Sequence, residues 1–373
     1  MTGRRQKQTF WADRAENMIL AAINGPWQTI TFLNFYLFEN EVLNEDTLEI
    51  IFYDIDTELE EICRKILRVF NFQKKTYNLS LLNQIRGLNF DKIWISKLFS
   101  QNPHMILQTF RNSDIVLFEE GLHSYAPTKL LSIAEILQTE QKKISIIRDL
   151  LEHQFNENRV ALKPIYAHLI LKSHFSRCIK KYLLLDMVGN SANTTIENKK
   201  LPAILEKVED VFVQDLWLPL YQESSRKKVM IIAQYFSYLN VLMYTDEINI
   251  YKQMVNHYLD MDYIIYWKSH PRMANFEQEL VNEFGDEKLI FIRSKLPAEF
   301  YSHLYPEIEY IGISSSSLLY KSLIFKGAAY QVAQNVIDKI NPQCPYAEDF
   351  RMMYQLISKF VPVNEHIRFG NSD

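Results

Sequence analysis

Apolar runs and amphipathic segments alternate along the chain and predict parallel sheets covered by helices. Short apolar runs between polar residues are typical of buried strands, and longer stretches with apolar residues three or four positions apart are typical of helices. Residues 151–190 are predicted to be mostly helical or mixed, and residues 190–195 to form a polar loop. In the first half, the pattern predicts strands at residues 48–53, 92–96 and 115–118 and helices near residues 57–70, 100–111 and 129–150.

The second half repeats this alternation. A polar segment within residues 215–227 separates it from the first half and predicts an N-terminal domain of residues 1–220 and a C-terminal domain of residues 221–373. Alternation of strand and helix is typical of parallel sheets, so the predicted architecture is two Rossmann-like α/β domains with a cleft between them. The strands are predicted at residues 228–234, 262–268, 289–292 and 309–313, with helices near residues 246–257 and 274–284.

Composition narrows the class of protein. Of the 373 residues, 47% are hydrophobic and 23% are charged, as in a globular chain, and the net charge of −4 argues against a nucleic-acid partner. The three cysteines form no CxxC pair, which fits a reducing compartment and a cytoplasmic protein without structural zinc. The pattern predicts no transmembrane helix and no signal peptide. The basic residues 1–8 are either a short solvated tail or a contact with an anionic membrane surface.

Two adjacent carboxylates end the predicted strand at residues 115–118. Glu119 and Glu120 follow that apolar run directly, and Gly121 follows them. Neighbouring carboxylates repel each other and are costly to desolvate, so a core strand has little structural reason to end on them. Sites in open α/β sheets lie outside the carboxyl ends of strands, which makes this pair a candidate acid or base. Taken alone, the pair is equally compatible with a surface turn.

The residues after the glutamates are candidate ligand contacts. Gly121 permits a tight turn beside a ligand. His123 and Tyr125 are either ligand contacts or packing residues, and Ser124 lies between them. The sequence therefore predicts a candidate ligand-contact loop at residues 121–125.

Two further polar motifs follow predicted strands in the second half. His270 and Pro271 come after the strand at residues 262–268, where a histidine can supply a proton or hold a phosphate. A loop histidine with a structural role is the alternative. Four serines follow the strand at residues 309–313, and hydroxyls with free N–H groups at a helix start form a phosphate cradle, although N-capping needs one serine. These serines are Ser314, Ser315, Ser316 and Ser317.

The three motifs together carry a resemblance to known enzymes. They resemble the (Asp/Glu)-(Asp/Glu)-Gly, His-Pro and serine motifs of bacterial sialyltransferases. The similarity is closest to the bacterial α-2,8-polysialyltransferase family of capsule synthesis, in which a stretch like Ser124-Tyr125-Ala126-Pro127 follows the first motif. Related motifs occur in lipooligosaccharide sialyltransferases. The matched motifs lie between about residues 115 and 320, and the first 100 residues show no match, which leaves acceptor specificity open.

The resemblance implies a GT-B-type fold, in which two Rossmann-like domains with parallel sheets face a central cleft. It also implies an inverting, metal-independent glycosyltransferase that needs no cofactor and takes CMP-sialic acid as donor and a glycan as acceptor. Glu120 would be the general base and Glu119 its support, and the loop after them would lie on the acceptor side, with Gly121, His123, Ser124 and Tyr125. His270, with Pro271, would contact the CMP phosphate and stabilise the leaving group. Ser315 and Ser316, with Ser314 and Ser317, would bind the same phosphate.

Several alternatives stay open from the sequence. Asp54 and Asp56 follow a predicted strand and form a DxD pattern that would hold a divalent metal in another kind of nucleotide-sugar transferase, although Thr57 and Glu60 fit a helix-capping box there. A non-catalytic glycan-binding or assembly protein with a GT-B fold is a second alternative. The donor is CMP-sialic acid or another CMP-nonulosonic acid, and association with the inner membrane or with capsule machinery fits the same resemblance. The sequence does not distinguish single addition from polymerisation.

Overall fold

The computed structural model describes most of residues 18–367. Within this range it leaves out residues 45–46, 73–75, 99–100, 122–123, 126–173, 175, 188–192, 220, 222–224, 271–274, 286–287 and 345–346. The helix predicted at residues 129–150, the basic N-terminal residues 1–8 and the candidate site residues His123 and Pro271 lie outside the described residues.

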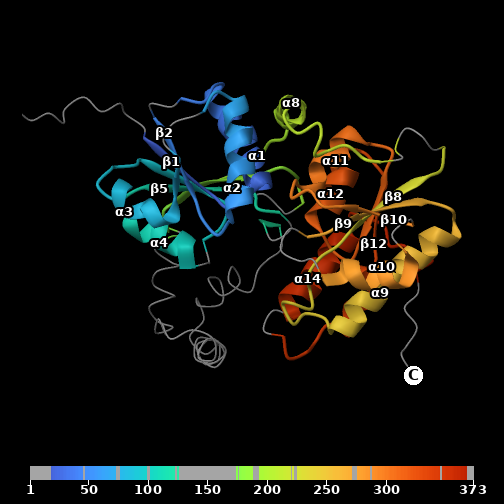
Figure 1. Ribbon diagram of the computed structural model, residues 1–373. Helices are drawn as coiled ribbons and strands as arrows, with labels where there is room; N and C mark the ends of the chain where they lie inside the picture. Colours follow the sequence, from blue (N-terminus) through green and yellow to red (C-terminus); the bar gives the residue numbers. More distant parts are fainter. Residues whose placement is uncertain are drawn as a thin grey trace, which may run out of the picture.

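Two all-parallel sheets form the centre of the molecule and stand side by side in Figure 1. The first has seven strands in the order β3-β2-β1-β4-β5-β6-β7, and the second has five in the order β10-β9-β8-β11-β12. The first-sheet strands are β1 (Ile19–Ile23), β2 (Leu48–Phe52), β3 (Thr76–Asn78), β4 (Lys92–Ile95), β5 (Asp114–Phe118), β6 (Cys178–Leu183) and β7 (Thr194–Ile196). The second-sheet strands are β8 (Lys228–Ile232), β9 (Ile264–Lys268), β10 (Leu289–Ile292), β11 (Glu309–Gly312) and β12 (Ala329–Gln331).

Helices cover the faces of both sheets, which is why the central strands are continuous apolar runs. Helix α8 packs against α1 and α2 of the first half and against α11 of the second. In the described residues, the helices of the first half are α1 (Pro26–Asn40), α2 (Thr57–Val69), α3 (Leu82–Ile85), α4 (Gln101–Thr109) and α8 (Leu201–Glu209). Those of the second half are α9 (Tyr244–Asp260), α10 (Asn275–Phe284), α11 (Ala298–Leu304), α12 (Ser316–Leu323), α13 (Ala333–Val336) and α14 (Ala347–Ser358), with short 3-10 turns at Leu79–Leu81 and Ile337–Lys339.

The predicted strands are confirmed as β2, β4, β5, β8, β9, β10 and β11, whereas the equally buried β1 was not predicted. Two further strands were not predicted: residues 178–183, within the stretch predicted as mostly helical or mixed, form β6, and residues 194–196 form β7, which overlaps the end of the predicted polar loop at residues 190–195. Both strands are only partly buried, and β6 carries Lys180 and Lys181 at its centre. These two lysines interrupt the apolar run that marks the neighbouring strands. Lys180 is accommodated in the sheet because its Nζ lies 2.5 Å from Oε1 of Glu39 on α1.

The start of α2 corrects the predicted capping box. Asp56, not Thr57, is the N-cap, because its side chain accepts the backbone N–H of Leu59 at 2.9 Å. Glu60 turns along the helix to pair with Arg64 and does not cap it. The helix therefore begins one residue earlier than the Thr57–Glu60 pattern indicates.

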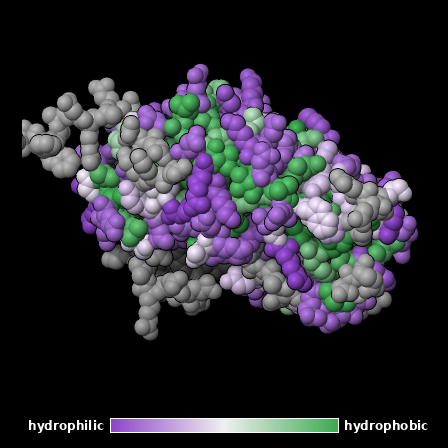
Figure 2. All heavy atoms as spheres, turned by 45° about the horizontal axis from the view of Figure 1, so that its top comes forward, coloured by the Kyte–Doolittle hydropathy of each residue, from purple (hydrophilic) through white to green (hydrophobic). Residues whose placement is uncertain are grey.

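The outer surface mixes polar and apolar side chains (Figure 2). Its exposed large apolar residues include Val213, Trp217 and Tyr238. Among the described residues, no helix is long and apolar enough to cross a membrane. Cys63, Cys178 and Cys344 are all free thiols.

Candidate active site

A pocket of about 470 Å³ lies between the two sheets. Segments that follow the carboxyl ends of β1, β4 and β5 contribute to one wall, and segments that follow β8, β9, β10 and β11 contribute to the other. In each sheet the order of strands reverses at the first strand of that sheet, β1 or β8. Open α/β sheets bind ligands outside the carboxyl ends of the strands at such reversals, so the fold alone favours this pocket as the site.

Glu119 is a buried structural carboxylate. Its side chain has no solvent exposure and accepts hydrogen bonds from the hydroxyls of Tyr125 and Tyr320 and from the backbone N–H of Leu184. Burial raises the pKa of Glu119 to about 7, against the opposite effect of these hydrogen bonds. Tyr320 belongs to α12, so this carboxylate joins the two halves of the molecule.

Glu120 points the other way and lines the pocket. Its carboxylate Oε1 lies 3.1 Å from Nζ of Lys97, which follows β4 and also lines the pocket. Side chains of successive residues leave an extended chain in opposite directions, which explains why one glutamate enters the core and the other the cavity. The arrangement agrees with the expected division of roles between the two glutamates, which remains a prediction.

The loop after the glutamates is fixed by its own hydrogen bonds. Gly121 has a φ of 138° and lines the pocket. The hydroxyl of Ser124 accepts the backbone N–H of Glu120 at 2.8 Å, and Tyr125 is buried against Glu119. Ser124 and Tyr125 thus hold the turn that carries Glu120, and contact with the acceptor stays a prediction for both.

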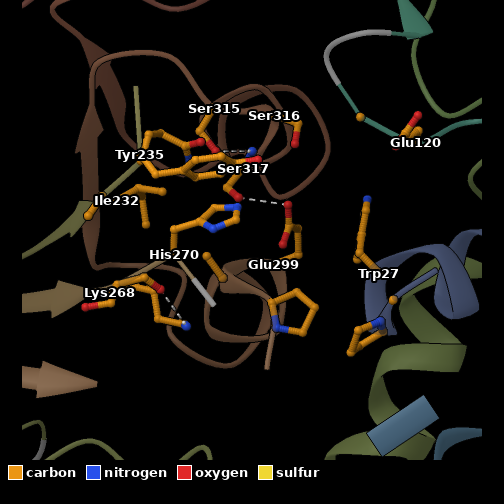
Figure 3. Close-up of a pocket in the computed structure, with 18 of the residues that line it drawn as sticks. Trp27, Glu120, Ile232, Tyr235, Lys268, His270, Glu299, Ser315, Ser316 and Ser317 are labelled. Carbon is orange, nitrogen blue, oxygen red and sulfur yellow. Dashed lines mark hydrogen bonds between the residues drawn. The ribbon is translucent and has the colours of Figure 1, made fainter. Parts of the chain in front are cut away.

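His270 lies across the pocket from Glu120, as Figure 3 shows. Its ring contacts the ring of Tyr235, with centroids 4.2 Å apart. Two residues earlier, Lys268 is almost fully buried, and its Nζ donates to the carbonyl oxygen of Ser294 at 2.8 Å. Burial lowers the pKa of Lys268 to about 8, while the nearby Glu299 and Glu277 act in the opposite direction. This wall of the pocket therefore presents the imidazole of His270 to the cavity, and the buried ammonium group of Lys268 lies behind it.

The serine motif forms the start of α12 beside His270 (Figure 3). Ser315 is the N-cap, and its hydroxyl accepts the backbone N–H of Ser317 at 3.2 Å. Ser317 donates its own hydroxyl to the buried carboxylate of Glu299 at 2.8 Å. The structure brings all four predicted serines into the pocket wall: Ser314, Ser315, Ser316 and Ser317.

The carboxylates of the DxD pattern, Asp54 and Asp56, already have hydrogen-bond or ion-pair partners. Asp56 caps α2 with one oxygen, and its other oxygen lies 2.9 Å from Nζ of Lys295. Asp54 accepts a hydrogen bond from the side chain of Asn102. In the described part of the chain, no group of three or more His, Cys, Asp and Glu side chains is arranged to hold a metal ion. The two aspartates therefore have structural partners where that alternative needs open ligands.

Several pocket residues were not predicted. Lys97 carried a usable signal, because it follows a predicted strand at the same sheet edge as Glu120. Trp27 was missed because β1 was not predicted, although Asn24, Gly25 and Pro26 before it are a turn signal. Glu299, in the first turn of α11, was missed because that helix was not predicted. Both side chains line the pocket and are nearly buried.

In the pocket, the carboxylate of Glu120 lies opposite a wall that can bind an anion. Glu120 can take a proton on one side, while His270 and the start of α12 can stabilise negative charge on the other. Two parallel sheets that meet at such a cleft define a GT-B-type α/β protein. The family model for α-2,8-polysialyltransferases (POLYST) matches residues 19–334, and the chain belongs to this family. It is a glycosyltransferase.

Two solved structures align with a TM-score of 0.50 and share this fold, and a third aligns less well. The Staphylococcus aureus MnaA–UDP co-structure aligns with a TM-score of 0.50 at 12% identity, over 93% of this chain and 92% of that one. UDP-GlcNAc 2-epimerase from Neisseria meningitidis, bound to UDP-GlcNAc, aligns with a TM-score of 0.50 at 10% identity, over 92% and 91%. The GT-B domain of a sialyltransferase from Photobacterium damselae aligns with a TM-score of 0.47 at 12% identity, over 92% and 98%. A search of curated proteins gave no match.

Proposed function

We propose that the protein transfers sialic acid, or a related nonulosonic acid, from its CMP donor to a hydroxyl of a glycan acceptor, with inversion and without a divalent metal. The observation that carries the proposal is the position of Glu120 across the pocket from His270 and the four-serine start of α12. A capsule polysaccharide or lipooligosaccharide is the proposed acceptor, and we place the reaction in the cytoplasm or at the inner face of the membrane.

The proposed reaction is a single displacement. Glu120 takes the proton of the acceptor hydroxyl as its oxygen forms a bond to the anomeric carbon of the donor. The bond between that carbon and the phosphate oxygen breaks, and CMP leaves with the electron pair. His270 stabilises the phosphate or gives it a proton, while Ser315, Ser316 and the first N–H groups of α12 donate hydrogen bonds to it. Attack from the wall opposite the leaving phosphate gives inversion.

The buried residues behind the pocket keep these groups in place. Glu119 holds the loop that carries Glu120, and Glu299 accepts the hydroxyl of Ser317. Because the base and the phosphate-binding groups lie on opposite halves, their separation depends on how the halves meet. Closure of the two halves on the substrates would then complete the site.

The test is CMP release from CMP-sialic acid, with product masses recorded for a panel of glycan acceptors. We expect turnover by the wild type, and a fall of about 10²- to 10⁴-fold in Glu120→Gln, the usual range for a lost general base. Glu365→Gln, which changes an exposed carboxylate outside the pocket, is the matched control and should keep full activity. Full activity of Glu120→Gln would exclude this base, and an inactive wild type would favour a glycan-binding protein.

Metal dependence is tested in the same assay. We expect equal rates with EDTA and with added Mg²⁺ or Mn²⁺, because His270, the serines and the helix start supply the positive charge at the phosphate. Loss of activity in EDTA, with recovery on adding metal, would support the Asp54–Asp56 alternative instead. Replacing the donor by other CMP-nonulosonic acids then identifies the sugar.

A further inference from the structure

The N-terminal end of α1 forms part of the pocket wall on the same side as Glu120. The helix is 15 residues long and begins directly after β1, at the point where the strand order reverses. Gly25 is its N-cap and offers no side-chain cap, and no acidic residue lies in the first turn. The first N–H groups of a helix lack partners within it and carry the positive end of the helix dipole. This end of α1 is therefore polarised to receive an anion.

Two buried polar atoms at this helix end have no hydrogen-bond partner in the part of the chain that the structure describes. Nε1 of Trp27 and Oδ1 of Asn24 have no hydrogen-bond partner among the described residues, although the two side chains are only 6% and 7% exposed. Both residues line the pocket, and Figure 3 shows Trp27 on the wall that faces His270. A buried donor or acceptor left unpaired costs about 1–3 kcal/mol, so such atoms in a pocket wall indicate a ligand.

The shape of the turn supports this interpretation. Gln28 lines the pocket beside Trp27. The position where a Cβ of residue 25 would lie is 2.8 Å from Oε1 of Gln28, so the Gln28 side chain folds back toward Gly25 at the helix start. The result is one donor from Trp27, backbone donors from the first turn, and one acceptor from Asn24. This set matches a sugar acid, which presents a carboxylate with hydroxyls nearby.

We propose that the N-terminal end of α1 is a carboxylate-binding subsite of the transfer site, formed by Asn24, Trp27, Gln28 and the first N–H groups of the helix. The inference rests on the proposed function, which gives the pocket a sugar substrate. The carboxylate comes from one of two sources: the sugar of the nonulosonic acid donor, or an acidic sugar at the end of the acceptor. The chemistry of recognition is the same for both.

Three variants test the subsite. Gln28→Glu places a carboxylate in the first turn, which the helix dipole tolerates well but which repels a bound carboxylate. Trp27→Phe removes the Nε1 donor and keeps a ring against Tyr320, whose centroid lies 5.2 Å from that of Trp27. Gln84→Glu makes the same change as Gln28→Glu at an exposed position outside the pocket and is the matched control. Thermal unfolding of each variant verifies that it is folded.

The measurement is equilibrium binding by calorimetry, which needs no turnover. The donor arm compares CMP with the non-transferable analogue CMP-3-fluoro-sialic acid. The acceptor arm compares an α2,8-linked sialic acid disaccharide with the same disaccharide whose carboxylates are reduced to alcohols. One of the two carboxylate ligands, the fluoro-sialyl donor or the acidic disaccharide, occupies the subsite. For that ligand we expect Gln28→Glu and Trp27→Phe to weaken binding by roughly tenfold or more, as for a lost hydrogen bond to a charged group. Gln84→Glu should bind like wild type, and CMP and the reduced disaccharide should bind all variants equally.

Each outcome decides the proposal. Weaker binding of the fluoro-sialyl donor alone assigns the subsite to the donor, and weaker binding of the acidic disaccharide alone assigns it to the acceptor. The proposal is overturned if both variants bind both carboxylate ligands like wild type, or if wild type does not prefer either one over its carboxylate-free counterpart. Turnover of CMP-sialic acid by the wild type is measured separately, so a failure of the proposed function is recognised independently of the subsite.

Discussion

The hydroxyl of Tyr320 on α12 donates a hydrogen bond to the buried carboxylate of Glu119 at the end of β5. Tyr320 lies one turn after the serines that begin α12, and Glu119 is the neighbour of Glu120. One hydrogen bond therefore connects the support of the proposed phosphate cradle to the support of the proposed base. The distance between Glu120 and the serines of α12 therefore depends on this contact between the halves.

Removing that hydrogen bond should affect both stability and catalysis. At pH 8, above the pKa of about 7 of Glu119, we expect Tyr320→Phe to lower the free energy of unfolding by about 2 kcal/mol, since a hydrogen bond to a charged group contributes about 1.5–3 kcal/mol. Tyr310→Phe is the matched control, because the Tyr310 hydroxyl is equally buried but donates to the carbonyl of Ala298 within the second half. Urea unfolding and kcat are measured for both. A kcat loss as large in Tyr310→Phe as in Tyr320→Phe would contradict a specific role for the bond between the halves.

The buried carboxyl of Glu119 should make stability depend on pH. Its pKa is about 7 in the folded protein against an ordinary value of 4.5, because burial disfavours the charged form. Between these two values the folded state holds a proton that the unfolded state has released. The free energy of unfolding from this group therefore falls as pH rises from about 4.5 to about 7, by roughly 3 kcal/mol in total.

Glu119→Gln provides the control for this pH effect. Its amide keeps the shape of the side chain but does not titrate, so the unfolding midpoint of the variant should change less between pH 5 and pH 7.5 than that of the wild type. The quantity to compare is the difference between variant and wild type at each pH, which removes the contributions of other groups. An equal change in both proteins would show that Glu119 is not buried as a titrating carboxyl.

Gly121 should not tolerate a side chain. Its φ of 138° is one that residues with a Cβ rarely adopt, and an added Cβ would lie 3.2 Å from Oγ of Ser316 on the opposite half. We expect Gly121→Ala to cost about 1–3 kcal/mol in backbone strain and to move the Glu120 loop away from the serine motif. The measurement is transfer rate together with CMP binding, and only the rate should fall strongly. Gly87→Ala, where a Cβ meets no atom within 4 Å, should leave the transfer rate unchanged.

The sequence predicted the parts of this site that lie at the ends of buried parallel strands. Such strands are continuous apolar runs, so the polar residues that end them stand out, as Glu120, His270 and Ser315 do. The sequence could not show that Glu119 is buried and Glu120 accessible, because the two residues are chemically identical and only the chain direction at the end of β5 separates them. Partners such as Tyr320 come from a helix of the other half, about two hundred positions away.

The parts that the sequence missed are those whose pattern is altered by tertiary contacts. Strand β6 was missed because Lys181 donates its Nζ to the carbonyl of Ser124, which lets a charged side chain lie in a sheet. Strand β1 and the start of α1 were missed, and with them Trp27, although Asn24, Gly25 and Pro26 follow the apolar run Ile19–Ile23 and are a turn signal that could have marked the end of a strand. Glu299 reaches the pocket from the first turn of α11, a helix that the sequence pattern did not predict.

Lys97 should position the proposed base. Its Nζ lies 3.1 Å from Oε1 of Glu120, and both side chains are about one quarter exposed. Without the ammonium group the carboxylate can rotate away from the acceptor hydroxyl, so we expect Lys97→Met to lower kcat by roughly tenfold, equivalent to about 1.4 kcal/mol in activation free energy. CMP binding should not change, since the phosphate-binding groups lie on the opposite wall. Lys180→Met breaks a similar pair with Glu39 far from the pocket and should keep wild-type kcat. Unchanged kcat in Lys97→Met, or an equal loss in both variants, would show that the Lys97 ion pair does not position Glu120.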